Sequence, residues 1–133
     1  MLKVCGAVGL AIGLMLPGLA AADTYECKLA REASGYVPQV FYFGIEAGAT
    51  TAKVDDGIIE YFNKSPMDAP VTKDTDAVLK FNWAVLMING SGQRTKMAYK
   101  ATFFRADGSI DIFARPAGYG NDFSSRGSCV KKQ

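Results

Sequence analysis

The chain contains no histidine, only three cysteines and a single tryptophan. Histidine is the commonest general base near neutral pH and the commonest metal ligand, so its absence excludes histidine-containing triads, HExxH zinc sites and carboxylate–histidine dyads. A dinucleotide-binding loop is missing too, because Gly118-Tyr119-Gly120 has no third glycine and no surrounding βαβ pattern. The sequence therefore predicts a protein that is not an enzyme and that holds no metal and no cofactor.

A strong excess of one charge is also missing. The formal net charge is +2, whereas a dedicated nucleic-acid binder carries a clear basic excess. No stretch after residue 22 is long and apolar enough to cross a bilayer, which takes about 20 residues. We therefore expect no nucleic-acid partner and no membrane span in the processed protein.

Residues 1–22 have the pattern of a secretory signal peptide. Lys3 provides the positive start, residues 4–16 are uncharged and mostly apolar, and small residues precede Asp23. A membrane anchor is the competing interpretation, but a proline interrupts this segment and shortens its apolar run. The pattern predicts cleavage before Asp23 and a periplasmic or secreted product.

The remaining residues 23–133 suit one domain, and losing Lys3 lowers the formal net charge to +1. Cys27 and Cys129 stand near its two ends, and two cysteines in an exported chain favour a disulfide. Closing a loop of this length restricts the unfolded chain by at most ~4.7 kcal/mol in the entropy treatment. Cys5 is expected to leave with the signal peptide.

Short apolar or alternating runs recur between turn residues over the whole domain. The clearest are 78–88, 95–105 and 110–115, which alternate with a period of two and predict a three-stranded meander. Further strands are predicted at 24–29, 37–45, 51–54, 58–62 and 125–130. Asp55-Asp56-Gly57 is predicted to be a hairpin turn, residues 65–77 a loop with at most a short edge strand near Val71, and 47–53 has room for a short helix.

This pattern predicts an all-β fold, a small antiparallel barrel or sandwich of about eight strands. The disulfide requires the Cα atoms of Cys27 and Cys129 to lie within ~7 Å, so the first and last strands must be close. We favour a barrel because closure also removes exposed strand edges.

The loop 116–123 is the first candidate binding site. It is rich in glycine, it contains Tyr119, Asn121 and Phe123, and Arg115 and Arg126 flank it. Tyrosine and arginine are favoured at binding hot spots, and loops on a rigid scaffold often carry binding residues. The alternative is that Tyr119 and Phe123 fold back and close the end of the barrel.

A basic patch is the second candidate site. Lys80, Arg94, Lys96 and Lys100 are predicted to share the outer face of two neighbouring strands. Such a patch would suit an anionic envelope polymer or a lipid headgroup, and the alternative is an ordinary solvated face.

Carboxylates are the remaining catalytic candidates. Asp55, Asp56 and Glu60 lie close in the sequence, but a glycosidase-like pair must face each other across a cleft, about 5–9.5 Å apart. We interpret the two aspartates as turn residues, and keep a carboxylate-only hydrolase as an alternative.

The run from Gly118 to Cys129, together with Tyr25-Glu26-Cys27, resembles small exported bacterial proteins to which no activity is assigned. The resemblance implies a periplasmic address and brings no functional residue with it. The layout is also similar to that of periplasmic lysozyme inhibitors, which are small β-barrels with bonded cysteines. Ser34-Gly35-Tyr36 is the nearest trace of their inhibitory loop.

Together these features predict an exported binding or interaction module of the bacterial envelope. Its partner would be an envelope protein, an anionic envelope polymer or a small apolar ligand, and the alternative is an enzyme-inhibitor-like protein. The position of the ligand depends on Phe81, Trp83, Tyr99 and Phe103, because a barrel of this size that they fill has room only for an external ligand.

Overall fold

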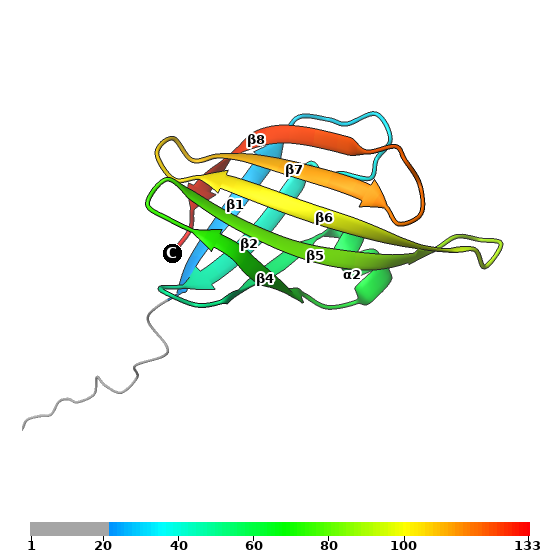
Figure 1. Cartoon of the computed structure of the whole chain (residues 1–133), viewed down its shortest axis with the longest axis horizontal. Coiled ribbons are helices and arrows are strands. Elements are labelled where there is room, and N and C mark those ends of the chain that lie inside the picture. The colour runs from blue at the N-terminus through cyan, green and yellow to red at the C-terminus, as the bar shows by residue number, and fades with distance from the viewer. Residues whose placement is uncertain (1–21) are drawn as a thin grey trace, which may run out of the picture.

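The computed structural model describes residues 22–133, which form a closed barrel of eight antiparallel strands in sequence order (Figure 1). The strands are β1 (Ala22–Leu29), β2 (Val40–Glu46), β3 (Thr51–Asp56), β4 (Met67–Asp74), β5 (Val78–Ile88), β6 (Arg94–Phe104), β7 (Ser109–Pro116) and β8 (Phe123–Lys131), and the helix α2 (Gly57–Asn63) lies between β3 and β4. The predicted signal peptide lies outside the described residues, except for Ala22. Within residues 22–133, no helix is long and apolar enough to cross a membrane.

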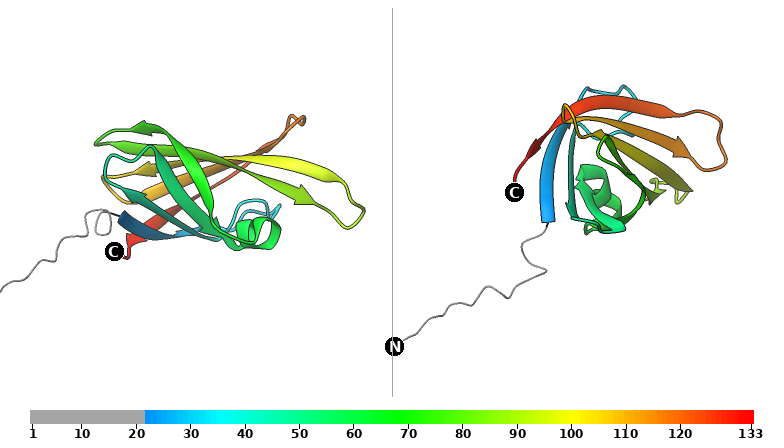
Figure 2. Two further views of the ribbon diagram at one scale, coloured as in Figure 1. Left: turned by 90° about the horizontal axis from the view of Figure 1, so that it is seen from below. Right: turned by 60° about the vertical axis from the view of Figure 1, so that its left-hand side comes forward.

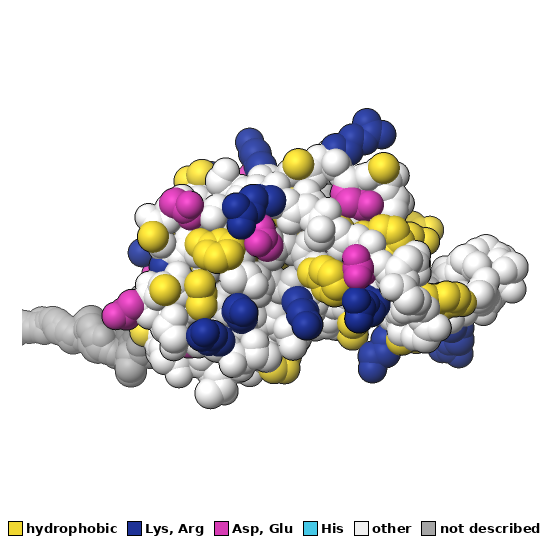
Figure 3. Space-filling view, turned by 45° about the horizontal axis from the view of Figure 1, so that its top comes forward, with side chains coloured by type: hydrophobic (Ala, Val, Ile, Leu, Met, Phe, Trp, Pro, Cys, Tyr) yellow, Lys and Arg dark blue, Asp and Glu magenta, His cyan; other side chains and the backbone are white. Residues whose placement is uncertain are grey.

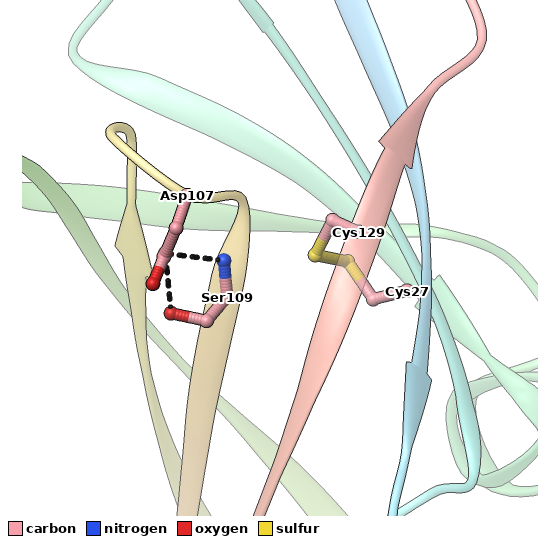
Figure 4. The surroundings of a disulfide bond; sticks show 4 residues. All are labelled: Cys27, Asp107, Ser109 and Cys129. Carbon is pink, nitrogen blue, oxygen red and sulfur yellow. Dashed lines mark hydrogen bonds between the residues drawn. A yellow bond between two sulfur atoms is a disulfide. The ribbon is translucent and has the colours of Figure 1, made fainter.

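The barrel closes between its first and last strands. Cys27 of β1 lies directly opposite Cys129 of β8, their Cα atoms are 3.9 Å apart, and their sulfur atoms are bonded (Figure 4). The turn between β6 and β7 lies beside this bond, and the Gly108 carbonyl accepts a hydrogen bond of 2.8 Å from the Cys129 N–H. The predicted disulfide is confirmed, and of the two predicted architectures the structure is the barrel.

Aromatic rings fill the interior, as the alternating strands predict. The Trp83 ring stacks between Phe41 and Tyr99, with centroid distances of 5.2 Å on each side. Phe81 and Phe103 are buried beside this stack. Because these large side chains occupy the middle of the barrel, a ligand is expected to bind outside it.

One predicted hairpin is wrong, because residues 58–62 belong to helix α2 rather than to a strand. The Asp56 carboxylate caps this helix by accepting a hydrogen bond of 2.8 Å from the Ile59 N–H. Lys64 ends the helix with a positive φ of 70°. Ile59 is fully buried against the barrel. Asp-Gly is typical of a hairpin turn and Asp is equally typical of a helix N-cap, so the local sequence did not separate the two.

The predicted loop at 65–77 is also wrong over most of its length, because Met67–Asp74 forms the full strand β4. Its inward side needs only Ala69, which is buried, and the half-buried Met67 and Val71. Pro70 pairs with Thr51, and the register with β5 shifts between Val71 and Lys73. Backbone pairing with β3 and β5 holds this segment as a strand, which its polar composition did not indicate. The possible helix at 47–53 is likewise a turn followed by β3.

The two ends of the barrel differ. Short turns at 47–50, 75–77 and 105–108 connect strands at one end, where both β1 begins and β8 ends. The other end carries the connections 30–39, 89–93 and 117–122 together with α2 (Figure 2). We call this second end the loop end, and it gathers four segments that are far apart in the sequence.

Candidate ligand groove at the loop end

A half-open groove of about 480 Å³ lies at the loop end. Its most deeply buried lining residues are Met87 and Met97, and the aromatic rings of Tyr36, Phe62, Tyr119 and Phe123 form much of the rest. Asn89, Gln93, Thr95 and Asn121 add polar groups, and Ile88 and Pro116 complete the lining. None of these twelve residues is charged. The groove therefore suits an apolar, uncharged group with a few hydrogen-bonding atoms.

The β1–β2 connection holds Tyr36 in the groove wall. The N–H and hydroxyl of Ser34 both donate to the Glu32 carboxylate, and the Tyr36 N–H donates to the Ser34 hydroxyl at 3.1 Å. Gly35 supplies the positive φ of 79° that this turn requires. From the core, the Tyr99 hydroxyl donates to the Tyr36 carbonyl at 2.7 Å. Burial raises the pKa of Tyr99, so its hydroxyl stays a donor.

The predicted contact loop divides into a packed part and an exposed part. Phe123 is half-buried and packs on Tyr36, with ring centroids 5.1 Å apart. Tyr119 is 53% exposed and its ring borders the groove, as does Asn121. The predicted folding back of the loop therefore holds for Phe123 but not for Tyr119. Phe123 closes the barrel end, whereas Tyr119 faces solvent over the groove.

The two arginines of the predicted site lie elsewhere. Arg115 pairs with Asp122 at 2.9 Å, and its guanidinium lies over the Phe113 ring at 5.4 Å. Arg126 makes two hydrogen bonds to Asp111, at 2.6 and 3.1 Å, and covers Phe104. Neither arginine lines the groove, and both instead shield aromatic rings on the outer surface.

The predicted basic patch is present on the outer face of β5 and β6. Lys80, Arg94, Lys96 and Lys100 are all exposed there, and none of them forms an ion pair with a described carboxylate. Lys and Arg side chains are spread widely over this side of the molecule (Figure 3). The patch is therefore a second surface, separate from the groove.

Asp55, Asp56 and Glu60 come together where β3 meets α2. Burial raises the pKa of Asp56 from 3.8 to about 6, and the hydrogen bond from the Ile59 N–H, which lowers this pKa, offsets only part of the increase. The neighbouring Asp55 carboxyl raises the pKa of Glu60. These carboxylates are not among the groove residues, and the role that Asp56 visibly performs is that of a helix cap. Within residues 22–133, no cluster of His, Cys, Asp or Glu is arranged to hold a metal ion.

The sequence did not point to most of the groove. Tyr36, Phe62, Met87 and Met97 come from four separate elements, and only the closed barrel brings them to one end. A usable signal was the pair of methionines, which lie near the ends of adjacent alternating strands on their inward side. Methionine is common at adaptable binding surfaces.

No family model, no curated protein and no solved structure matches this chain. Function is therefore inferred from the groove and the surface alone.

Proposed function

We propose that this chain is a binding module of the bacterial envelope and that its ligand occupies the groove at the loop end. The observation that carries the proposal is the groove itself, about 480 Å³ in volume and lined by twelve uncharged residues from the strands and connections at the loop end. Ligand sites in proteins are concave, mostly apolar and bordered by a few polar groups, and this groove has each property.

The chemistry of the lining favours a neutral, largely apolar ligand. Met87, Met97 and Phe62 offer dispersion contacts, and Asn89 and Asn121 offer amide groups that donate and accept hydrogen bonds. A charged ligand would find no counter-ion among the lining residues and would lose hydration on entering. The ligand is external to the barrel because the aromatic stack around Trp83 occupies the interior.

The envelope location rests on two features. Residues 1–22 have the pattern of a signal peptide, and the disulfide between Cys27 and Cys129 is of a kind that persists in oxidising compartments. Both features favour an exported protein that works in the periplasm or outside the cell.

The neutral fluorescent probe N-phenyl-1-naphthylamine tests the groove, because its emission rises in apolar surroundings. We expect saturable binding to residues 23–133, and Tyr119→Ala is expected to raise the Kd about fivefold, as loss of a contact worth ~1 kcal/mol would. Tyr42→Ala is the matched control, since Tyr42 is similarly exposed but lies on the barrel wall away from the groove. Absence of saturable binding, or equal weakening by both variants, would contradict the proposal.

A further inference from the structure

The hairpin of β5 and β6 projects beyond its neighbours at the loop end (Figures 1 and 2). Strand β5 pairs with β4 only up to Phe81, so residues 82–88 have no paired partner in that strand. Likewise, β6 pairs with β7 only from Met97 onward, so residues 94–96 have no paired partner in β7. One hydrogen bond still reaches this segment, from the Ala117 N–H to the Lys96 carbonyl. The end of the hairpin is therefore a two-stranded ribbon with an inner and an outer face.

The outer face of this ribbon combines apolar and basic side chains in register. Leu86 lies directly opposite Lys96, and Ile88 lies directly opposite Arg94. Leu86 and Ile88 are 46% and 48% exposed, which is unusual for two large aliphatic residues so close together on one face. The turn at 89–93 that joins the strands is polar and carries no charge. We call Leu86, Ile88, Arg94 and Lys96 the hairpin face.

The positive charge of the hairpin face is free of internal partners. Among the described residues, Arg94 and Lys96 form no ion pair, whereas six other basic residues do. Lys80 and Lys100 continue the same outer face along the barrel, and Lys100 lies over the Phe113 ring at 6.0 Å without a carboxylate partner. This side of the molecule therefore presents four exposed cations without an ion-pair partner among the described residues, beginning at the ribbon.

We propose that the hairpin face docks on an anionic lipid bilayer, with Arg94 and Lys96 at the headgroups and Leu86 and Ile88 below them. Apolar side chains flanked by basic ones are the pattern by which surface elements lie in a membrane interface. A soluble anionic polymer would use the cations but would leave the two aliphatic side chains in water. The uncharged turn can approach the headgroups without repulsion. Ile88 also borders the groove, so this site adjoins it, whereas Leu86, Arg94 and Lys96 are not among the groove residues.

Flotation of the protein with vesicles tests the proposal. Residues 23–133 are expected to bind vesicles of equal parts phosphatidylglycerol and phosphatidylcholine, to bind pure phosphatidylcholine much less, and to be released by high salt. Arg94→Gln with Lys96→Gln is expected to weaken binding by about tenfold or more, since each basic residue near the surface strengthens it severalfold. The matched control is Lys28→Gln with Arg31→Gln, which removes one exposed lysine of β1 and one exposed arginine of the connection after it, neither of which forms an ion pair among the described residues.

A second pair of variants separates a lipid surface from a soluble anionic polymer. Leu86→Ser with Ile88→Ser keeps every charge, and is expected to weaken vesicle binding several-fold while leaving binding to dextran sulfate unchanged. Thermal unfolding checks that the variants are folded, which the exposure of both residues favours. The proposal is overturned if the wild type ignores anionic vesicles, if the control pair weakens binding as much as the hairpin pair, or if the serine variant floats like the wild type.

Discussion

Asp56 offers the sharpest test of how the structure sets stability. Its carboxylate is almost fully buried at the start of α2, and burial raises its pKa from 3.8 to about 6. The folded protein thus binds this proton more tightly than the unfolded chain does. The difference between the two pKa values corresponds to roughly 3 kcal/mol. This contribution to stability is fully present below pH 3.8, and is lost as the pH rises through about 6.

Asp56→Asn removes the buried charge and keeps the side-chain oxygen that accepts from the Ile59 N–H. The charged cap also gains about 0.3–1 kcal/mol from the helix dipole, which the amide loses. We therefore expect the variant to be more stable than the wild type by about 2–3 kcal/mol at pH 7.5, and to show little or no advantage near pH 3.5.

Urea unfolding, followed by the fluorescence of Trp83, measures this difference at a series of pH values. Asp76→Asn is the control, because Asp76 is an exposed carboxylate in the turn before β5. Its substitution is expected to change stability by less than about 0.5 kcal/mol. If Asp56→Asn instead lowers stability at pH 7.5, the charged cap is favourable and the burial argument is wrong.

Three further changes probe the pairing of β1 with β8 and the groove wall. Gly127→Ala is expected to lower stability by about 3 kcal/mol, because a Cβ at this position would lie 2.0 Å from the Lys28 carbonyl oxygen. Gly120→Ala is the control: its Cβ would meet nothing within 4 Å, so the melting temperature should stay nearly unchanged. Replacing both Cys27 and its partner by alanine is expected to lower the free energy of unfolding by about 2–5 kcal/mol, and a reductant should then have no further effect on the variant. Tyr99→Phe removes the hydroxyl that donates to the groove wall, so we expect a loss of about 1–2 kcal/mol in urea unfolding together with weaker binding of N-phenyl-1-naphthylamine, and unchanged probe binding would show that this hydrogen bond does not shape the groove.

The sequence correctly predicted those strands whose own residues alternate between apolar and polar. In β5, alternation from Leu79 to Met87 marks the inward side without reference to any neighbour, and its partner β6 repeats the pattern. Strand β4 carries no such signal, because a barrel fills its inner side with residues as small as Ala69 when large ones face it from other strands. Helix α2 was missed for a related reason. Ile58 and Ile59 favour strands, and this segment is helical because the helix buries Ile59 against the barrel.

The candidate site was predictable only in part. Glycine and exposed aromatic residues marked the loop at 116–123, and Tyr119, Asn121 and Phe123 do line the groove. Arg115 and Arg126 do not line the groove, and each lies beside an acidic partner and an aromatic ring on the outer surface. Which charges are neutralised depends on strand register, and register is a property of the whole barrel.

The strands that close the barrel are also the first and the last of the described chain. A polypeptide that emerges from its N-terminus can form the meander from β1 onward step by step, but the second edge of β1 must wait for β8, about a hundred residues later. Until then both β1 and the newest strand have an unpaired edge, which is the surface through which β proteins aggregate. Closure of the barrel therefore cannot precede the formation of β8, and oxidation of the two thiols can report its moment.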